Sequence, residues 1–253
     1  MSVTVGQVLE LLEQIAPLAL AEEWDNVGLL AGSRADAVDR VLCALDFHRG
    51  VLEEAIACGA QMIVTHHPIL FRARRNLCAD DPEGRLLSDL ARSGIALAAM
   101  HTNFDNVHPG VNDALADALG LKSVIALEHG MCVGEIPQTS LGAFRADVQA
   151  RLGGVVRAYG PSDRKISRVA VLGGAGEDFA SEARRAGADV YVTGEMAYHK
   201  ALSALEDGLC TLEAGHAETE KPAISLLCGA LQNAADDVQY KIRVLCSARE
   251  LFG

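Results

Sequence analysis

Two segments of this chain repeat one another, and the repeat limits the folds that the sequence can adopt. When residues 40–65 are placed on residues 168–193 without a gap, eight of the 26 positions are identical. The identities are Arg-Val at the start, Glu-Ala and Gly-Ala in the middle, and Val-Thr at the end of both segments. We interpret this as an internal duplication, with one repeat over residues 1–127 and the other over residues 128–253.

Each copy reads as a strand, a helix and a second strand. The strands are short aliphatic runs without alternation, such as residues 41–45 and 62–64, which is typical of strands buried on both faces. Half of the residues are hydrophobic and only 4% are aromatic, so aliphatic side chains must fill the interior. The predicted fold is therefore α/β, with mixed sheets flanked by helices.

Further elements are expected outside the duplicated segments. Thr4 and Ser140 have the side chains of helix N-caps, and each precedes apolar residues at helical spacing. The single tryptophan, Trp24, is expected to anchor the core, since buried aromatic residues beside turns are common. Outside the duplicated segments we expect further helices near residues 86–92 and 111–119 and further strands near residues 95–100 and 155–159; within them, the helices are expected near residues 49–58 and 178–186 and the strands of the second copy near residues 169–172 and 190–192.

Two adjacent histidines, His66 and His67, follow the strand 62–64 directly. Pro68 cannot donate a ladder hydrogen bond and favours extended backbone before it, so the strand should end here. Successive side chains on extended backbone point apart, which suits two ions lying side by side better than one ion. The alternative is that these are two ordinary histidines in a surface turn.

A histidine followed four residues later by a carboxylate occurs in both halves, as His101 with Asp105 and His216 with Glu220. On helical backbone the two side chains would share a face, but the nearby prolines 109 and 222 favour a turn. Glu195 follows Val-Thr in the second copy as the histidine pair does in the first. It is a candidate acid or base, the alternative being a carboxylate that caps a helix.

Six polar groups thus follow predicted strand ends, where ligands gather in α/β sheets. They are His66, His67, His101, Asp105, His216 and Glu220. Mixed imidazole and carboxylate ligands suit zinc, iron, manganese, cobalt or nickel, whereas calcium prefers oxygen alone. The set fits two divalent metal ions per chain, sharing a carboxylate and a water and leaving positions open for a small-molecule substrate.

Six motifs, spread in order over nearly the whole chain, resemble those of a known family. They are Trp-Asp-Asn-Val-Gly-Leu (24–29), Thr-His-His-Pro (65–68), His-Thr-Asn-Phe-Asp (101–105), Gly-Val-Asn-Asp (110–113), Val-Thr-Gly-Glu (192–195) and Gly-His-Ala-Glu-Thr-Glu (215–220). In these motifs the chain is similar to the Nif-three-like dinuclear metal-binding proteins, often labelled GTP cyclohydrolase I type 2 homologues.

The resemblance implies a ligand set and an assembly. It implies that His66 and His216 hold one ion, that His67 and Asp105 hold the other, and that Glu220 bridges them. It also implies that the two α/β repeats are intertwined around one metal site and that the chain forms a toroidal homo-hexamer.

Two functions from different classes remain open. One is a metal-dependent hydrolase acting on a small cyclic, amide or nucleotide-like substrate; the other is a non-catalytic metal-binding or metal-delivery protein that works as a ring. Once five ligands are assigned, His101 is left over. In the hydrolase it can transfer a proton, or it can orient a ligand through a hydrogen bond.

Composition excludes several other classes. A net charge of −12 and a pI near 5.1 argue against nucleic-acid or anionic-membrane surfaces, which need basic patches. No apolar run approaches the ~20 residues needed to span a bilayer, and no signal peptide is visible. The seven cysteines are widely spaced without a C-x-x-C pair. This indicates core thiols in a reducing compartment, and we expect a cytoplasmic protein.

Overall fold

The computed structural model describes residues 2–249, which form two compact units. The first unit contains residues 2–104 together with residues 224–249, and the second contains residues 105–223. These bounds differ from the repeats predicted at 1–127 and 128–253. The difference arises because the C-terminal segment returns to the first unit, where its strand pairs with a strand of the first repeat. Both units are α/β, as the sequence predicts.

The first unit is built on a five-stranded sheet in the order β13-β4-β5-β6-β2. Its strands are β2 (Gly28–Ala31), β4 (Arg40–Ala44), β5 (Met62–Thr65), β6 (Ala96–Ala99) and β13 (Arg243–Cys246). All neighbours are parallel except β2, which pairs with β6 in the antiparallel sense. A separate two-stranded ribbon joins β1 (Val3–Thr4) to β3 (Ala37–Val38).

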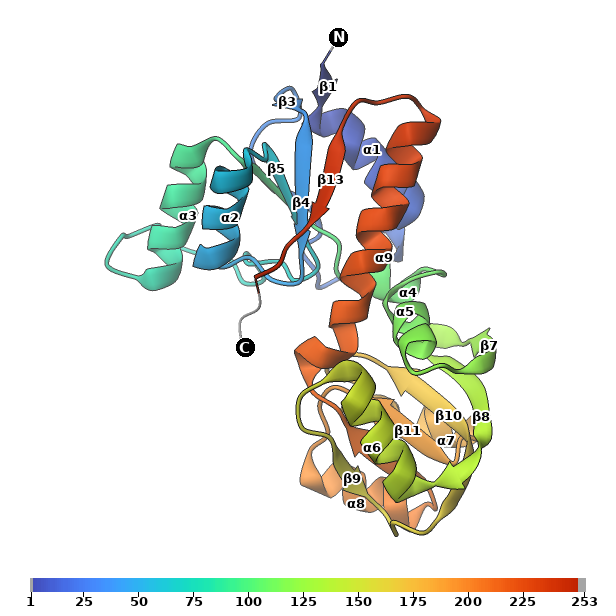
Figure 1. Ribbon diagram of the computed structural model, residues 1–253. Coiled ribbons are helices and arrows are strands. Elements are labelled where there is room, and N and C mark those ends of the chain that lie inside the picture. The colour runs from blue at the N-terminus through green and yellow to red at the C-terminus, as the bar shows by residue number, and fades with distance from the viewer. Residues whose placement is uncertain (1, 250–253) are drawn as a thin grey trace. The chain divides into compact units, whose positions relative to one another are not determined.

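Helices cover both faces of this sheet (Figure 1). On one face lie α2 (Arg49–Cys58) and α3 (Pro82–Ser93), whose apolar residues share a buried cluster with Leu42 and Ile63 of the strands. On the other face lie α1 (Val5–Ile15) and the C-terminal part of α9 (His216–Asp237). Thr4 caps α1 in a capping box with Gln7, which confirms the cap predicted there.

The second unit is built on a six-stranded sheet in the order β7-β8-β10-β11-β12-β9. Its strands are β7 (Lys122–Ala126), β8 (Cys132–Ser140), β9 (Arg157–Tyr159), β10 (Lys165–Leu172), β11 (Val190–Thr193) and β12 (Cys210–Glu213). The three strands β10, β11 and β12 are parallel, and the remaining pairings are antiparallel.

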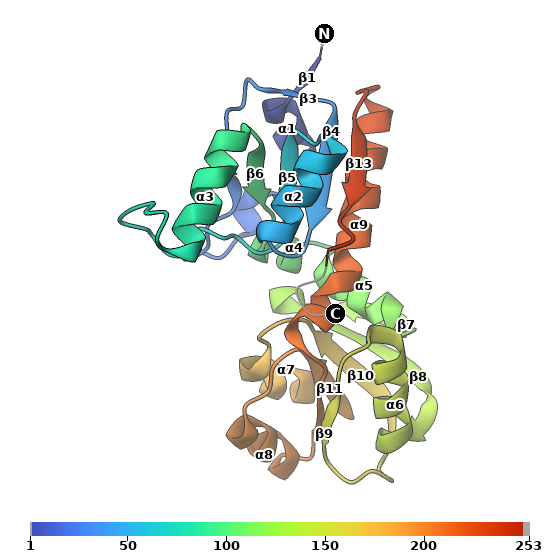
Figure 2. The ribbon, with the colours of Figure 1, turned by 60° about the vertical axis from the view of Figure 1, so that its left-hand side comes forward.

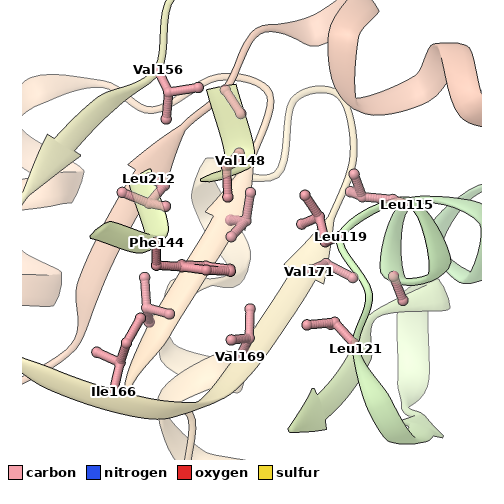
Figure 3. Packing of buried hydrophobic residues seen from close by; sticks show 14 of the residues in the cluster. Leu115, Leu119, Leu121, Phe144, Val148, Val156, Ile166, Val169, Val171 and Leu212 are labelled. Carbon is pink, nitrogen blue, oxygen red and sulfur yellow. The ribbon is translucent and has the colours of Figure 1, made fainter. Parts of the chain in front are cut away.

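The helices of this unit also lie on both faces of its sheet (Figure 2). On one face are α5 (Val111–Ala118) and α6 (Leu141–Leu152), which Ser140 caps as predicted. Figure 3 shows Phe144 and Val148 of α6 packed over Val169, Val171 and Leu212 of the strands. On the other face are α7 (Ala180–Arg185) and α8 (Tyr198–Glu206).

Short helical segments complete the description. Three 3-10 helices cover Leu18–Leu20, Glu128–Gly130 and Glu177–Phe179, so the helix expected over 178–186 begins with a 3-10 turn. The chain passes between the units through α4 (Thr102–Asn106) and α9. Among residues 2–249, no helix is long and apolar enough to cross a membrane.

The duplicated segments fold with the same strand register. In the first unit β4 pairs with β5 from Val41 opposite Met62 to Ala44 opposite Thr65. In the second, β10 pairs with β11 from Val169 opposite Val190 to Leu172 opposite Thr193. The offset of 128 residues that aligns the sequences also aligns these four pairs, so the structure supports the duplication.

Candidate metal centre

Three histidines lie together at the carboxyl ends of β5 and β6 in the first unit. His66 and His67 follow β5 directly, and His101 comes two residues after the end of β6. One ring nitrogen from each lies within 4.8 Å of the other two, and the rings of His66 and His101 have centroids 5.2 Å apart. The parallel sheet therefore brings together residues that are 34 positions apart in the chain.

The His66 and His67 rings are each held at Nδ1 by an oxygen that can only accept a hydrogen bond. His66 Nδ1 lies 2.8 Å from the carbonyl oxygen of Met100, and His67 Nδ1 lies 2.8 Å from Oδ1 of Asp46. Each Nδ1 therefore donates this hydrogen bond. Metal-ligating histidines have this arrangement, because the outer hydrogen bond fixes the tautomer and the ring orientation.

His101 is held in the same way by Asp25. Its Nδ1 lies 2.9 Å from Asp25 Oδ1, while the other carboxylate oxygen accepts hydrogen bonds from the backbone and hydroxyl of Thr102. Burial by itself raises the pKa of Asp25, but the hydrogen bonds from His101 and Thr102 outweigh burial and hold this pKa well below its usual range.

Two predicted ligands and Glu195 meet in the second unit. His216 and Glu220 lie one turn apart at the start of α9, where His216 Nε2 is 3.2 Å from Glu220 Oε1. Glu195 follows β11, and its Oε1 lies 2.6 Å from His216 Nδ1. This carboxylate holds His216 as Asp46 holds His67. The acid or base role of Glu195 stays a prediction.

A glycine turn presses against these ligands. A Cβ on Gly174, whose φ is +63°, would lie 2.3 Å from Glu220 Oε1 and 3.3 Å from His216 Nε2. A Cβ on Gly194 would lie 2.8 Å from the Cα of His216. Glycine at these two positions avoids a clash with the ligand residues, and the donors themselves, imidazole and carboxylate, fit a divalent ion.

The backbone after His101 and His216 is helical, so the turn favoured by Pro109 and Pro222 is wrong. Asp105 lies within α4, and Glu220 lies within α9, which continues through Pro222. A proline inside a helix removes one backbone hydrogen bond and kinks it, a cost that the packing of a long helix can offset. The two His–carboxylate pairs thus lie on helical surfaces.

Trp24 is not the core anchor that the sequence suggests. It is 60% exposed, with its ring in edge contact with Phe71 at 5.7 Å and with His101 at 6.3 Å between centroids. Phe71 also meets the His101 ring edge-on at 6.1 Å. Two partly exposed aromatic rings therefore flank this histidine.

Sequence reasoning did not assign the residues that hold the imidazoles. Asp46 lies two residues after the end of β4, and Asp25 lies in the Trp-Asp-Asn motif. The available signal for Asp46 is a carboxylate just after a strand. It occupies the position that Gly174 has in the other copy of the duplication. Their partners lie 21 and 76 residues away, a relation that only the folded chain reveals.

Fold and side chains together define an α/β protein that carries two clusters of groups suited to divalent metals, one in each unit. The chain belongs to the Duf34/NIF3 (NGG1p interacting factor 3) family, whose model matches residues 3–250. The predicted resemblance is thereby confirmed.

Relatives over the full length bear the name that the sequence suggested. A GTP cyclohydrolase 1 type 2 homolog of Clostridium acetobutylicum is 32% identical over 269 residues, covering 99% of this chain and 98% of the relative. Another protein of that name, from Streptomyces coelicolor, is 32% identical and covers 95% of this chain and 90% of its own length.

Solved structures agree in fold. A hypothetical protein of Staphylococcus aureus aligns with a TM-score of 0.95 and 30% identity over 100% of this chain and 98% of that chain. A Bacillus cereus protein related to NIF3 aligns with a TM-score of 0.94 and 25% identity over 99% of this chain and 98% of that chain.

Proposed function

We propose that this protein is a metal-dependent hydrolase that acts on a small cyclic, amide or nucleotide-like substrate. The observation that carries the proposal is the shared state of four imidazoles, those of His66, His67, His101 and His216. Each is held at Nδ1 by a carbonyl or carboxylate oxygen. Packing alone gives no reason for four imidazoles to be held in this way, three of them after β5 and β6 and His216 at the start of α9.

The proposed ligands are His66, His67, Asp105, His216 and Glu220, for two divalent ions per chain. The donors narrow the choice of metal, because imidazole and carboxylate together suit zinc, iron, manganese, cobalt or nickel. When bound, such ions supply an activated water and polarise an oxygen of the substrate. Asp46 and Glu195 fix the orientation of His67 and His216 toward the ions.

His101 is the proposed proton donor to the leaving group. Because Asp25 holds its Nδ1, the proton exchanges at Nε2. One ring nitrogen of His101 lies within 4.8 Å of a ring nitrogen of His66 and of His67. The low pKa of Asp25 keeps that carboxylate ionised throughout turnover, so it orients the imidazole without taking the proton itself.

A pocket in the first unit supports a substrate that is planar and anionic. It has a volume of about 690 Å³ and is lined in part by Asp25, Phe71, Arg72 and Arg75. The exposed ring of Trp24 lies against Phe71 at its edge. Aromatic rings can stack on a base or another planar ring, while the guanidinium groups favour phosphate or carboxylate.

The test is a turnover screen of the metal-loaded protein against nucleotides, cyclic amides and phosphoesters. Hydrolysis of one class, lost in Glu220→Ala and kept in Glu206→Ala, would support the hydrolase; Glu206 is an exposed glutamate at the end of α8 and serves as the matched control. Uniform inactivity with tightly held, exchangeable metal would instead favour a metal-delivery protein.

A binding titration separates recognition from catalysis. Trp24 is the only tryptophan and is 60% exposed, so its fluorescence should change when a nucleotide enters the pocket. We expect Arg72→Ala combined with Arg75→Ala to weaken nucleotide binding at least tenfold. Equal binding of nucleotides and uncharged nucleosides would contradict an anionic substrate.

We also propose a homo-hexamer. The edge strand β7 is exposed along its whole length, and its Ile125 is 55% exposed. An exposed apolar edge strand favours association with another chain. Light scattering should give six chains of 26.7 kDa per particle, and Ile125→Lys should dissociate it. A monomer of the unaltered protein at micromolar concentration would contradict this proposal.

A further inference from the structure

A third group of metal-binding side chains lies in the second unit, apart from the proposed ligands. His108 precedes α5, Asp113 lies in its first turn, and Cys132 is the first residue of β8. One ligand atom from each, a ring nitrogen, a carboxylate oxygen and the thiol sulfur, lies within 4.8 Å of the other two. Three elements of the fold therefore converge on one point with three different donors.

The carboxylate of Asp113 stands at the centre of this group. Its Oδ2 lies 2.9 Å from His108 Nδ1 and accepts a 2.8 Å hydrogen bond from the backbone of Gly110. The Cys132 sulfur lies within 4.8 Å of an oxygen of this carboxylate and 3.9 Å from the carbonyl oxygen of Gly130. The backbone bond from Gly110 fixes the carboxylate in place.

Burial differs across the group in a way that suits an ion entering from solvent. Cys132 has no exposed surface, whereas the side chains of His108 and Asp113 are 32% and 29% exposed. An ion can therefore reach the imidazole and carboxylate first and then the buried sulfur. The protein supplies three ligands, which leaves a fourth position for water.

We propose that His108, Asp113 and Cys132 bind one further divalent ion, with zinc as the preferred metal. Thiolate, imidazole and carboxylate are the three zinc ligand types in proteins, and a soft sulfur disfavours magnesium, calcium and manganese. On binding, the ion replaces the thiol proton, which leaves to solvent, and the hydrogen bond between His108 and Asp113 gives way to coordination.

The environment of the thiol is consistent with this site. Burial, together with the neighbouring Asp113 carboxylate, raises the pKa of Cys132 to about 12. A cation beside both groups reverses these effects, because it stabilises the thiolate and the carboxylate together. Helix capping accounts for the hydrogen bond from the Gly110 backbone to Asp113. It gives no reason for the buried sulfur of Cys132 beside the same carboxylate.

Cobalt provides a test that is specific to this site. The five ligands proposed for the other two ions contain no cysteine, so a thiolate-to-cobalt charge-transfer band reports only a cysteine site. Titration of the metal-free full-length chain with Co²⁺ should give such a band at one equivalent of sulfur-bound ion per chain. Absence of the band at excess Co²⁺ would overturn the proposal.

Three variants assign the band. Cys132→Ser should abolish it, whereas Cys210→Ser, which alters another buried cysteine of the same sheet, should keep it. Because His108 lies at the surface, His108→Ala should leave the fold intact while weakening cobalt binding at least tenfold. A band of unchanged amplitude in Cys132→Ser, or unchanged affinity in His108→Ala, would show that these residues do not bind the ion.

Discussion

Glu195 Oε1 lies 2.6 Å from His216 Nδ1, so that a carboxylate at the end of β11 fixes an imidazole at the start of α9. In the first unit Asp46 stands in the same relation to His67, after the preceding strand. Each carboxylate accepts a hydrogen bond from Nδ1, which leaves Nε2 as the atom proposed to face a metal ion. The orientation of the proposed ligands is therefore built by residues that do not themselves bind the metal.

Glu195→Ala should weaken metal binding by about 10–100-fold, because His216 loses the partner that fixes its tautomer. Competition with a calibrated chelator measures this affinity. Glu206→Ala serves as the control, since its exposed side chain lies in the same unit. Unaltered affinity in Glu195→Ala, together with a large loss of turnover, would instead assign Glu195 as the acid or base.

Gly174→Ala should remove metal binding at His216 and Glu220, because the new Cβ would lie 2.3 Å from Glu220 Oε1. Gly94→Ala is a matched control: Gly94 has a φ of +68° against +63° for Gly174, and a Cβ there meets nothing within 4 Å. Both variants carry a similar backbone strain, so equal metal content in the two would contradict the steric account.

Asp25→Asn should destabilise the metal-free protein by about 1–3 kcal/mol at pH 7, since charge-assisted hydrogen bonds to His101 and Thr102 are weakened. The pKa of Asp25 is lowered in the folded state. Its contribution is therefore complete above the unfolded-state pKa of about 3.9 and is lost as the pH falls below that value.

Denaturant unfolding in chelator between pH 7 and pH 3 measures this difference. The gap in stability between the unaltered protein and Asp25→Asn should be constant near neutrality and should narrow below about pH 4. A gap that stays the same down to pH 3 would mean that the Asp25 carboxylate does not carry the interaction.

The parts of the site that the sequence predicts are those encoded locally. An aliphatic run that stops on His66 and His67 defines a strand end, and the parallel order of β5 and β6 then places His101 beside them. The repeat predicts the common register of the strand pairs, because identical Val-Thr residues close both copies.

Other parts depend on contacts that local patterns do not encode. The pairing of Asp25 with His101 joins residues 76 positions apart. In β8 a glycine, a proline and polar residues hide the strand, which is held by its neighbours β7 and β10 rather than by its own pattern. Trp24 was expected to be buried, yet it lies on the surface beside His101.

The histidine of the His–carboxylate pair stands one position later in the second copy of the duplication than in the first. Met100 and Ala214 donate equivalent backbone hydrogen bonds to Thr65 and Thr193, both at 2.8 Å. The structural counterpart of His101 is therefore Gly215, not His216. The two His–carboxylate pairs therefore stand one position apart relative to the strands before them. The alignment of residues 40–65 with 168–193 ends before these residues and does not show the shift.

His101→Ala should keep both proposed ions and lower kcat by about 10²–10⁴, if its Nε2 delivers a proton to the leaving group. Metal analysis and turnover must be measured on the same preparation. One ring nitrogen of His101 lies within 4.8 Å of a ring nitrogen of His66 and of His67. Loss of an ion from His101→Ala would make it a ligand and would end its role in proton transfer.

Five side chains are proposed to hold two divalent ions in each chain. Metal analysis of the purified protein tests this assignment most directly. Protein prepared without chelator should contain close to two divalent ions per chain beyond any ion bound at Cys132, which the Cys132→Ser variant removes. His67→Ala and Asp105→Ala should each lose one ion preferentially while remaining folded. Full metal content in the double variant His67→Ala with Asp105→Ala would contradict the assignment.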